Sequence, residues 1–437
     1  MQTTFTDEQR ADPKIVEAEA ILRKCVHCGF CTSTCPTFVL LGDERDSPRG
    51  RIYMIKEMLE NDRPADAEVT RHIDRCLSCL SCMTTCPSGV DYMHLVDRAR
   101  AHINETYDRP WHDRLMRAVL AATVPNPARF RLALAGARLA RPFAGLAAKL
   151  PVIGARAAAM LALAPDKLPA ARPPAAATAA GPRRGRVALL NGCAQAVLAP
   201  SINAAAARLL ARAGYDVVAA PGEHCCGSLV LHMGKEEAAK AAARINVDAW
   251  TAVLETGGLD AVVITASGCG TTIKDYGHLL ADDPAYAAKA ARVSALAKDV
   301  SEMLATLDLG EPERRSAVVV AYHSACSMQH GQKISLEPKA LLTRAGFAVK
   351  DVPEGHICCG SAGVYNILQP EIAGQLRERK RGNLAKTKAA IVATGNIGCI
   401  VQLADRPGET GRPVAHTVEL LDWAYGGPEP ASLAGRL

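Results

Sequence analysis

Apolar residues recur at helical spacing through the first hundred residues of the chain. The positions that show this spacing are Ile15, Ala18, Ile21 and Leu22 in one stretch and Ile52, Ile55 and Leu59 in a second. Each stretch follows a helix-start signal, Thr6-Asp7-Glu8-Gln9 in the first and Ser47-Pro48 in the second. The segment from Val90 to Tyr107 is also typical of a helix. The pattern therefore predicts a helical N-terminal domain that ends near residue 107.

The C-terminal half shows a different pattern, in which short apolar runs alternate with helical stretches. The runs that predict strands are 186–193, 214–218 and 259–265, and then 317–326, 346–350 and 389–394. The same order occurs twice, and each copy carries an adjacent cysteine pair followed by glycine. The spacing from Cys193 to Cys225 is 32 residues, as is the spacing from Cys326 to Cys358. We predict two α/β units with parallel or mixed sheets, packed about a pseudo-twofold axis, with cysteines at the carboxyl ends of strands.

Between these halves lies a basic, alanine-rich connector. Residues 114–164 contain no acidic side chain, but they carry arginines and a lysine among apolar residues. Such a segment is typical either of a helix that lies on a membrane or a partner, or of bridging helices that pack on the next domain. Residues 165–186 form a Pro/Ala-rich linker. The predicted domains are 1–107, the connector and linker 108–185, and the two units 186–312 and 313–437.

The length and composition of the chain argue against an integral membrane protein and against a nucleic-acid-binding protein. The 437 residues are too many for one core. No apolar run approaches the ~20 residues that cross a bilayer. The net charge of +6 is mild and aromatic residues make up 4% of the chain, which argues against nucleic-acid binding. The polar start of the chain resembles no signal peptide, so we expect a cytoplasmic, reducing environment in which thiols stay free for metal.

Eight of the sixteen cysteines form two runs with the pattern C-x2-C-x2-C-x3-C-P. This pattern is the bacterial ferredoxin signature, in which three close thiolates hold one [4Fe–4S] cluster and the fourth holds the other. The ligand sets are therefore predicted to cross. The first cluster would take Cys25, Cys28, Cys31 and Cys86, and the second would take Cys76, Cys79, Cys82 and Cys35. Structural zinc is the main alternative, but zinc modules usually separate two C-x2-C pairs by a long spacer.

The other eight cysteines divide equally between the two α/β units. The first unit contributes Cys193, Cys225, Cys226 and Cys269, and the second contributes Cys326, Cys358, Cys359 and Cys399. Four soft ligands in each unit suit a further iron–sulfur cluster or zinc, and a buried cysteine cluster without metal stays open. His224, His356 and His323 lie near these cysteines and could hydrogen-bond to sulfur. Arg45, Arg49 and Arg51 lie between the ferredoxin runs, either as a solvated face or near a cluster or partner.

The two Cys-Cys-Gly units resemble the cysteine-rich CCG domain of several redox subunits. These are the heterodisulfide reductase B subunit, the anaerobic glycerol-3-phosphate dehydrogenase C subunit, the lactate-utilisation iron–sulfur proteins and the glycolate oxidase iron–sulfur subunits. The resemblance is strongest to the last group, and the stretches that carry it are 191–195, 221–229, 266–272 and 394–399. One departure is clear. Where the reductase has the earlier cysteine of a final C-x2-C pair, this chain has Ala266 and Asn396, so disulfide reduction at these units is not expected.

The sequence shows no G-x-G-x-x-G fingerprint, no P-loop and no Ser-His-Asp arrangement. We therefore expect no flavin or nicotinamide site in this chain and no oxidation of a substrate by this chain alone. The resemblance implies an electron-transfer subunit of a glycolate dehydrogenase complex. Its flavin-containing partner subunits would oxidise glycolate to glyoxylate, and electrons would pass to a quinone at the inner face of the cytoplasmic membrane or to another acceptor. D-lactate and glycerol 3-phosphate are the alternative substrates, and a heterodisulfide-reductase-like enzyme or a zinc scaffold are the alternatives of other classes.

Overall fold

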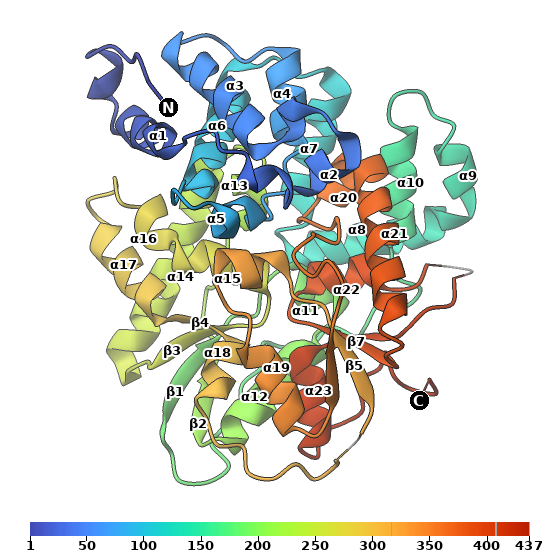
Figure 1. The fold of residues 1–437 in the computed structure, drawn as a ribbon. Helices are drawn as coiled ribbons and strands as arrows, with labels where there is room; N and C mark the ends of the chain where they lie inside the picture. Colours follow the sequence, from blue (N-terminus) through green and yellow to red (C-terminus); the bar gives the residue numbers. More distant parts are fainter. Residues whose placement is uncertain (316, 407–408, 437) are drawn as a thin grey trace.

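Helices alone build the first 107 residues, which are blue in Figure 1. The structure is a computed structural model that describes residues 1–315, 317–406 and 409–436; positions 316, 407–408 and 437, within the predicted second unit, lie outside the described residues. The N-terminal helices are α1 (Pro13–Lys24), α2 (Pro36–Leu41), α3 (Pro48–Glu60), α4 (Ala67–Asp74), α5 (Ser81–Thr85) and α6 (Tyr92–Thr106), with short 3-10 turns η1 (Gln9–Ala11), η2 (Phe30–Thr32) and η3 (Glu44–Asp46). Leu22, Ile55, Ile73 and Leu95 are fully buried in their common core.

Helix α3 begins at the predicted capping signal, whereas helix α1 begins at a different residue from the one predicted. The Ser47 side chain accepts a hydrogen bond from the Gly50 amide at 3.0 Å, and Pro48 occupies the first position of α3, as predicted. At the N-terminus, Thr6 and Gln9 bond to each other's backbone amides, but this pair opens only the short turn η1. The helix α1 is capped instead by Asp12, which accepts from the Lys14 amide at 2.9 Å and precedes a proline.

The connector folds into helices that pack on both units. They are α7 (Trp111–Thr123), α8 (Pro127–Ala140), η4 (Arg141–Phe143), α9 (Ala144–Ala147) and α10 (Gly154–Leu163). Leu120 packs with Met233 of the first unit and Leu368 of the second, and Leu134 packs with Val197. On their inner face, these helices therefore match the prediction of bridging helices that pack on the next domain. Their outer face nevertheless leaves large apolar side chains exposed. Among the described residues, none of the helices has the length and apolar character needed to cross a membrane.

The Pro/Ala-rich linker does not hang free of the fold. Ala177 pairs antiparallel with Val217, with backbone bonds of 3.0 and 2.8 Å, and the Ala179 amide bonds to Asp216. Strand β2 lies at the edge of its sheet, so its outer amides and carbonyls would otherwise face solvent. The linker covers this edge.

Two parallel four-stranded sheets form the C-terminal half. The first has the order β2-β1-β3-β4, from β1 (Gly185–Leu189), β2 (Tyr215–Val218), β3 (Ala261–Ile264) and β4 (Ala297–Asp299). The second has the order β6-β5-β7-β8, from β5 (Val319–Tyr322), β6 (Ala348–Asp351), β7 (Ile391–Thr394) and β8 (Val414–His416). The prediction of two repeated α/β units is confirmed. The sequence did not predict β4 and β8, because a three-residue strand is too short to show a periodic pattern.

Helices cover both sheets, and the two units share one core. The first unit has α11 (Ala194–Leu198), α12 (Ser201–Arg212), α13 (Ser228–Leu231), α14 (Glu236–Gly257), α15 (Ser267–Lys274), α16 (Tyr276–Leu279), α17 (Ala287–Leu296) and α18 (Val300–Ala305). The second has the π-helical turn η5 (Ser327–Gly331), α19 (Glu337–Arg344), α20 (Tyr365–Leu368), α21 (Pro370–Lys386), α22 (Ile397–Leu403) and α23 (Thr417–Ala424). Val187, Leu210, Val320 and Leu420 meet in that core.

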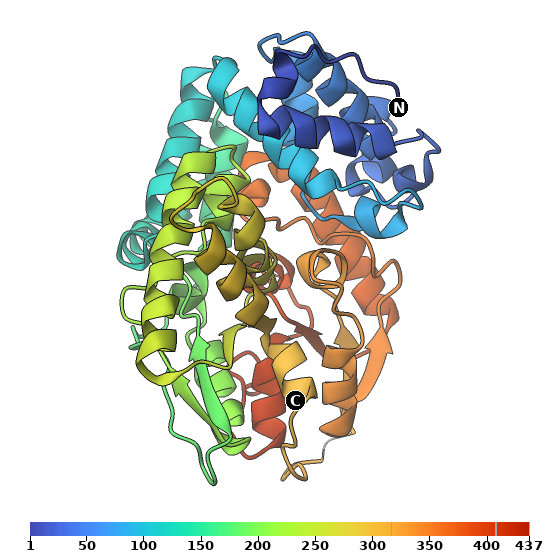
Figure 2. The same cartoon turned by 90° about the vertical axis from the view of Figure 1, so that its left-hand side faces the viewer.

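The contacts between the units show the pseudo-twofold axis. Helix α12 packs on α23, and α18 packs on α19. Because α19 is the counterpart of α12 and α23 that of α18, the two contacts are equivalent. Both α18 and α23 also begin with a capping box, made by Asp299 and Glu302 in one and by His416 and Glu419 in the other. The N-terminal domain lies above the carboxyl ends of the strands in both views (Figures 1 and 2).

Candidate metal centres

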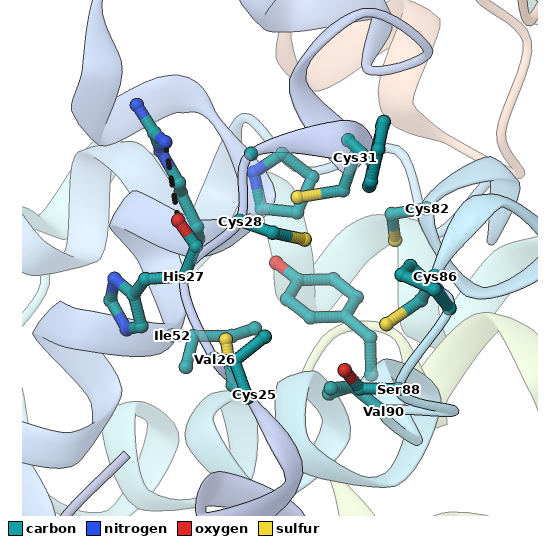
Figure 3. A pocket seen from close by; sticks show the side chains of 16 residues that line it. Cys25, Val26, His27, Cys28, Cys31, Ile52, Cys82, Cys86, Ser88 and Val90 are labelled. Carbon is teal, nitrogen blue, oxygen red and sulfur yellow. Dashed lines mark hydrogen bonds between the residues drawn. The ribbon is translucent and has the colours of Figure 1, made fainter.

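The first cysteine pocket lies at the surface of the N-terminal domain. Cys25, Cys28, Cys31 and Cys86 line it, together with Cys82 (Figure 3). Cys28 is exposed, and its neighbours Val26 and Phe30 leave 67% and 63% of their surface in solvent. Burial raises the pKa of the Cys31 thiol to about 11. The side of the pocket at Cys28, Val26 and Phe30 is open to solvent.

The second pocket lies deeper in the same domain. Its cysteines are Cys35, Cys76, Cys79 and Cys82, all of them buried. Each pocket thus combines three cysteines of one run with the cysteine that precedes the proline in the other run. Cys82 lines both. This grouping agrees with the crossed ligand sets, and the assignment of the ligands themselves stays a prediction.

The same local conformation shapes both cysteine loops. In the first run His27 and Gly29 have positive φ angles of 55° and 86°, and in the second run Ser78 and Leu80 have 48° and 60°. Positive φ is uncommon for residues other than glycine, and the loop needs it at equivalent places. A Cβ atom at Gly29 would lie 2.6 Å from the Arg49 guanidinium. The repeated spacing therefore reflects a repeated turn that brings three sulfurs to one side.

A buried charge network lies beside the second pocket. Arg51, 1% exposed, donates to Cys35 Sγ at 3.7 Å and to Thr37 Oγ1 at 2.9 Å. Asp46 is fully buried and accepts from Arg51, His72 and Arg75. Tyr92 also lines this pocket, and its hydroxyl donates to Cys76 Sγ at 3.8 Å. Hydrogen bonds to cluster sulfurs and nearby cations are the means by which proteins set cluster potentials.

The three arginines of this region have different roles. Arg45 is an exposed partner of Asp43 and Glu68, so the solvated-face interpretation describes it. Arg49 pairs with Glu44 but also lines the first cysteine pocket, where it donates to the His27 carbonyl at 3.4 Å, so the interpretation that places it near a cluster site describes it better. Arg51 is the one of the three that reaches a cysteine. Asp46, Thr37 and Tyr92 were not predicted as site residues. The signal that could have found Asp46 and Arg51 is their place in the insertion between the two runs, where charged residues flank a helix start.

A third cavity of about 260 Å³ lies between the two α/β units. All eight of their cysteines line it, and Cys76, Leu77 and Ser78 of the second ferredoxin run close it from above. Cys193 and Cys326 stand directly before α11 and η5, while Cys269 and Cys399 lie within the first turn of α15 and α22. The expectation that these cysteines gather at the carboxyl ends of the strands agrees with this cavity.

Glycine after each cysteine pair lets a helix approach the thiols. Gly227 and Gly360 have φ angles of 83° and 88°. A Cβ atom at Gly360 would lie 2.7 Å from the Ala373 carbonyl, and one at Gly227 would lie 3.1 Å from the Ala239 carbonyl. Any larger residue would push α21 or α14 away from the cysteine pair.

The thiols within each unit are neighbours. In the second unit Cys326 Sγ lies 3.4 Å from Cys358 Sγ, and Cys359 Sγ lies 3.6 Å from Cys399 Sγ. In the first unit hydrogen bonds from Cys193 and Cys226 lower the pKa of Cys225. Soft sulfur atoms this close together, and buried, form a donor set that suits a thiophilic metal.

The second ferredoxin pocket touches the second unit. Leu77 and Cys79 pack in one cluster with Cys358 and Tyr365, and the Tyr365 hydroxyl donates to the Arg75 carbonyl at 2.9 Å. Burial, together with the nearby Cys326 thiol, raises the pKa of Cys79 well above its usual value. Buried thiols of this kind ionise when a metal coordinates them, so the donor set fits a metal cluster.

The three histidines near these cysteines differ in position. His224 and His356 have exposed side chains. His323 is buried, and burial lowers its pKa to about 3, so its imidazole is neutral. Neither ring nitrogen has a hydrogen-bond partner within residues 1–315, 317–406 and 409–436. Ala266 and Asn396 also line the cavity, and the Asn396 side chain accepts from the Gly398 amide at the start of α22.

Comparison with protein families matches the three cysteine-bearing regions. A model described as a 4Fe-4S dicluster domain matches residues 21–90, which include all eight cysteines of the two pockets. A model described as a cysteine-rich domain, named CCG, matches twice, at residues 187–274 and 320–404. The dicluster model implies two [4Fe–4S] clusters in the N-terminal domain. The description of the CCG model names no metal.

Two curated relatives align with nearly the whole chain, and a third aligns with about half of it. The glycolate oxidase iron-sulfur subunit of Escherichia coli (strain K12) is 42% identical over 97% of this chain and 99% of its own length. The probable glycolate oxidase iron-sulfur subunit of Bacillus subtilis (strain 168) is 33% identical over 93% of this chain and 95% of its own. The lactate utilization protein A of Bacillus licheniformis is 25% identical over 54% of this chain and 99% of its own.

Proposed function

Because this chain belongs to the family of glycolate oxidase iron–sulfur subunits, we propose that it carries electrons from flavin-containing subunits that oxidise glycolate to glyoxylate. The electrons leave for a quinone or another acceptor. The observation that carries this proposal is the pair of four-cysteine pockets, one open to solvent and the other buried against the CCG units. The flavin belongs to the partner subunits, since the sequence has no dinucleotide fingerprint.

The ligands of the two clusters are the crossed sets. Cys25, Cys28, Cys31 and Cys86 hold the first, and Cys76, Cys79, Cys82 and Cys35 hold the second. The membership of the two pockets supports this assignment. When bound, such clusters take up and release single electrons. The chain leaves the first site at its surface, buries the cysteines of the second, and directs Arg51 and Tyr92 at the sulfurs of Cys35 and Cys76.

The two pockets suggest a direction of transfer. Val26 and Phe30 expose apolar surface beside Cys28, which is the kind of contact that a partner protein covers. Among the described residues that line the second pocket, none is a large apolar residue exposed to solvent, and the pocket meets the second CCG unit through Leu77 and Cys79. We therefore place the flavin partner at the first pocket and the exit of electrons on the side of the CCG units. A further iron–sulfur cluster or zinc in those units fits their thiols.

Exposed side chains of the connector helices support the transfer of electrons to a membrane quinone. Trp111, Leu115, Leu132 and Leu139 expose between 56% and 81% of their surface on α7 and α8. The chain carries no acidic residue from 114 to 164, so every charged side chain in that stretch is basic. Apolar and basic side chains on one helical face suit the surface of an anionic bilayer. The proposed location is the inner face of the cytoplasmic membrane, to which the protein binds peripherally.

Purification of the tagged chain without oxygen, from cells that express the whole complex, tests the function. We expect at least about eight iron atoms per chain, with acid-labile sulfide, flavin in a co-purified partner, and dye reduction that depends on glycolate. The same preparation with D-lactate or glycerol 3-phosphate decides between the substrates. Recovery of a flavin-free monomer that contains zinc only would overturn the proposal.

A rival of another class is a heterodisulfide-reductase-like enzyme at the CCG units. It predicts that Cys225→Ser and Cys358→Ser abolish disulfide turnover and leave the ferredoxin-type EPR signals intact. Ala266 and Asn396 occupy the positions of the missing cysteines, and this observation disfavours the rival. We expect no disulfide turnover in the unmodified complex.

A further inference from the structure

The two CCG units differ at one position that faces the thiols. Leu190 follows β1 and His323 follows β5, each three residues before the first cysteine of its unit. The backbone places them alike, since the Leu190 amide donates to Val263 at 3.0 Å and the His323 amide donates to Ala393 at 2.8 Å. In the first unit the apolar Leu190 packs against Cys226. In the second unit a nitrogen donor occupies the equivalent place.

The surroundings of His323 leave its imidazole without a partner. The side chain is 2% exposed, and both ring nitrogens lack a hydrogen bond among the described residues. Buried polar groups are almost always bonded to protein, water or an ion, so the unpartnered imidazole of His323 is available as a ligand. A ring nitrogen of His323 and the sulfurs of Cys359 and Cys399 lie within 4.8 Å of one another.

The sulfur separation is close to that expected for one metal ion. Zinc–sulfur bonds of ~2.3 Å in a tetrahedral site place two sulfurs ~3.7 Å apart. Cys359 Sγ and Cys399 Sγ are 3.6 Å apart. A neutral imidazole in the same group would complete three ligands of mixed type without adding a negative charge.

We infer that His323 is a metal ligand of the second CCG unit, together with Cys359 and Cys399, whereas the first unit offers thiolates alone. The metal is zinc or an iron of an iron–sulfur centre, because both accept imidazole beside thiolate. A site with one imidazole in place of a thiolate carries less negative charge. For iron this substitution raises the reduction potential, as in Rieske-type centres. The duplicated units therefore hold chemically different sites, whatever substrate the partner subunits oxidise.

The first test uses the unmodified full-length protein, purified without oxygen. Metal analysis decides between zinc and iron beyond that of the two ferredoxin clusters. X-ray absorption at the zinc edge, or nitrogen coupling in pulsed EPR of a reduced iron site, then reports the ligands. We expect one histidine nitrogen together with sulfur at the second unit. Sulfur-only ligation, or no metal beyond the ferredoxin iron, would overturn the inference.

The second test compares three variants of the same protein. His323→Leu copies the residue of the first unit, and His323→Gln keeps a hydrogen-bond donor but is a poor metal ligand. His356→Leu is the matched control, because it removes an exposed imidazole two residues from Cys358. We expect both His323 variants to lose the nitrogen signal and to release the metal to a chelator at least about tenfold more readily. The control should match the unmodified protein. Full retention of metal in His323→Gln would reduce His323 to a hydrogen-bonding role and contradict the inference.

Discussion

The two CCG units share strand order, helix contacts and cysteine spacing, yet they meet the N-terminal domain differently. The second unit touches the second ferredoxin run directly, through the packing of Cys358 with Cys79 and the hydrogen bond between Thr84 and His330. The first unit meets the domain at its rim through ion pairs, such as Lys14 with Glu236 and His94 with Asp275. The two units therefore have the same fold, but each makes different contacts with the N-terminal domain.

The difference has a consequence for electron transfer. Only short protein paths separate the buried second pocket from the thiols of the second unit, since Leu77, Cys79, Cys326 and Cys358 belong to one packed cluster. The first unit shares the central cavity but lacks that direct packing on Cys79. We therefore expect substitutions near the second unit to affect electron transfer. Substitutions near the first unit should mainly weaken the packing of the N-terminal domain on that unit.

The largest effect is expected from Cys35→Ser, which removes a sulfur from the second pocket. If the ligand sets cross, the cluster that depends on Cys76, Cys79 and Cys82 is lost, and iron falls by about four atoms per chain. Glycolate-dependent dye reduction should fall at least about 100-fold, or ~2.7 kcal/mol in barrier. EPR of the reduced protein and iron analysis check the result. Cys86→Ser is the matched variant and should remove the other signal. Loss of the same signal in both variants would show that the sets do not cross.

A smaller effect is expected from Arg51→Met on the same side. The change leaves Asp46 with His72 and Arg75 and removes the donor to Cys35 Sγ. Breaking a buried charge pair typically costs about 3–5 kcal/mol of stability. The reduction potential of the second cluster should also fall, because a nearby cation favours the more negative reduced state. Redox titration by EPR and thermal bleaching of the cluster absorbance measure the two effects.

The control for that experiment is Arg49→Met. Arg49 pairs with Glu44 near the surface, so its loss should change stability by no more than about 1 kcal/mol. It should also leave the potential of the second cluster unchanged. Equal effects of the two substitutions would mean that the burial of Arg51 has no influence on the cluster.

The sequence predicted more of the fold than of this asymmetry. The cysteine spacing and the repeated strand order predicted the helical domain and the two parallel α/β units, because local patterns encode them. The strands β4 and β8 were missed because each has only three residues. The difference between Arg51 and Arg49 could not be predicted, since both are arginines on one helix and only tertiary packing buries one of them. The sequence named His323 as a residue that could hydrogen-bond to sulfur, but its burial beside Cys359 depends on residues far apart in the chain.

The smallest effect is expected at the first-unit side, from His94→Gln. His94 lies between Asp91 and Asp275, at 2.9 and 3.1 Å, and its ring stacks on His278 at 3.6 Å, which in turn pairs with Glu17. Burial acts against protonation, but the hydrogen bonds to Asp275 and Asp91 outweigh it and raise the pKa of His94 to about 10. The protonated form is thus the one that holds α6 against the first unit.

The raised pKa fixes the sign of the pH dependence. The folded protein holds the His94 proton up to about pH 10, whereas the unfolded chain releases it near its ordinary value of 6.5. The stabilisation is therefore complete below about pH 6.5 and is lost as the pH rises toward 10. His94→Gln should cost about 1.5–3 kcal/mol at pH 6, and much less at pH 10. Thermal unfolding of both proteins across this range, with the cluster signals monitored in parallel, measures the difference. The proposed role of these ion pairs would be wrong if the difference in stability between the two proteins grew at high pH. It would also be wrong if the variant lost its cluster signals.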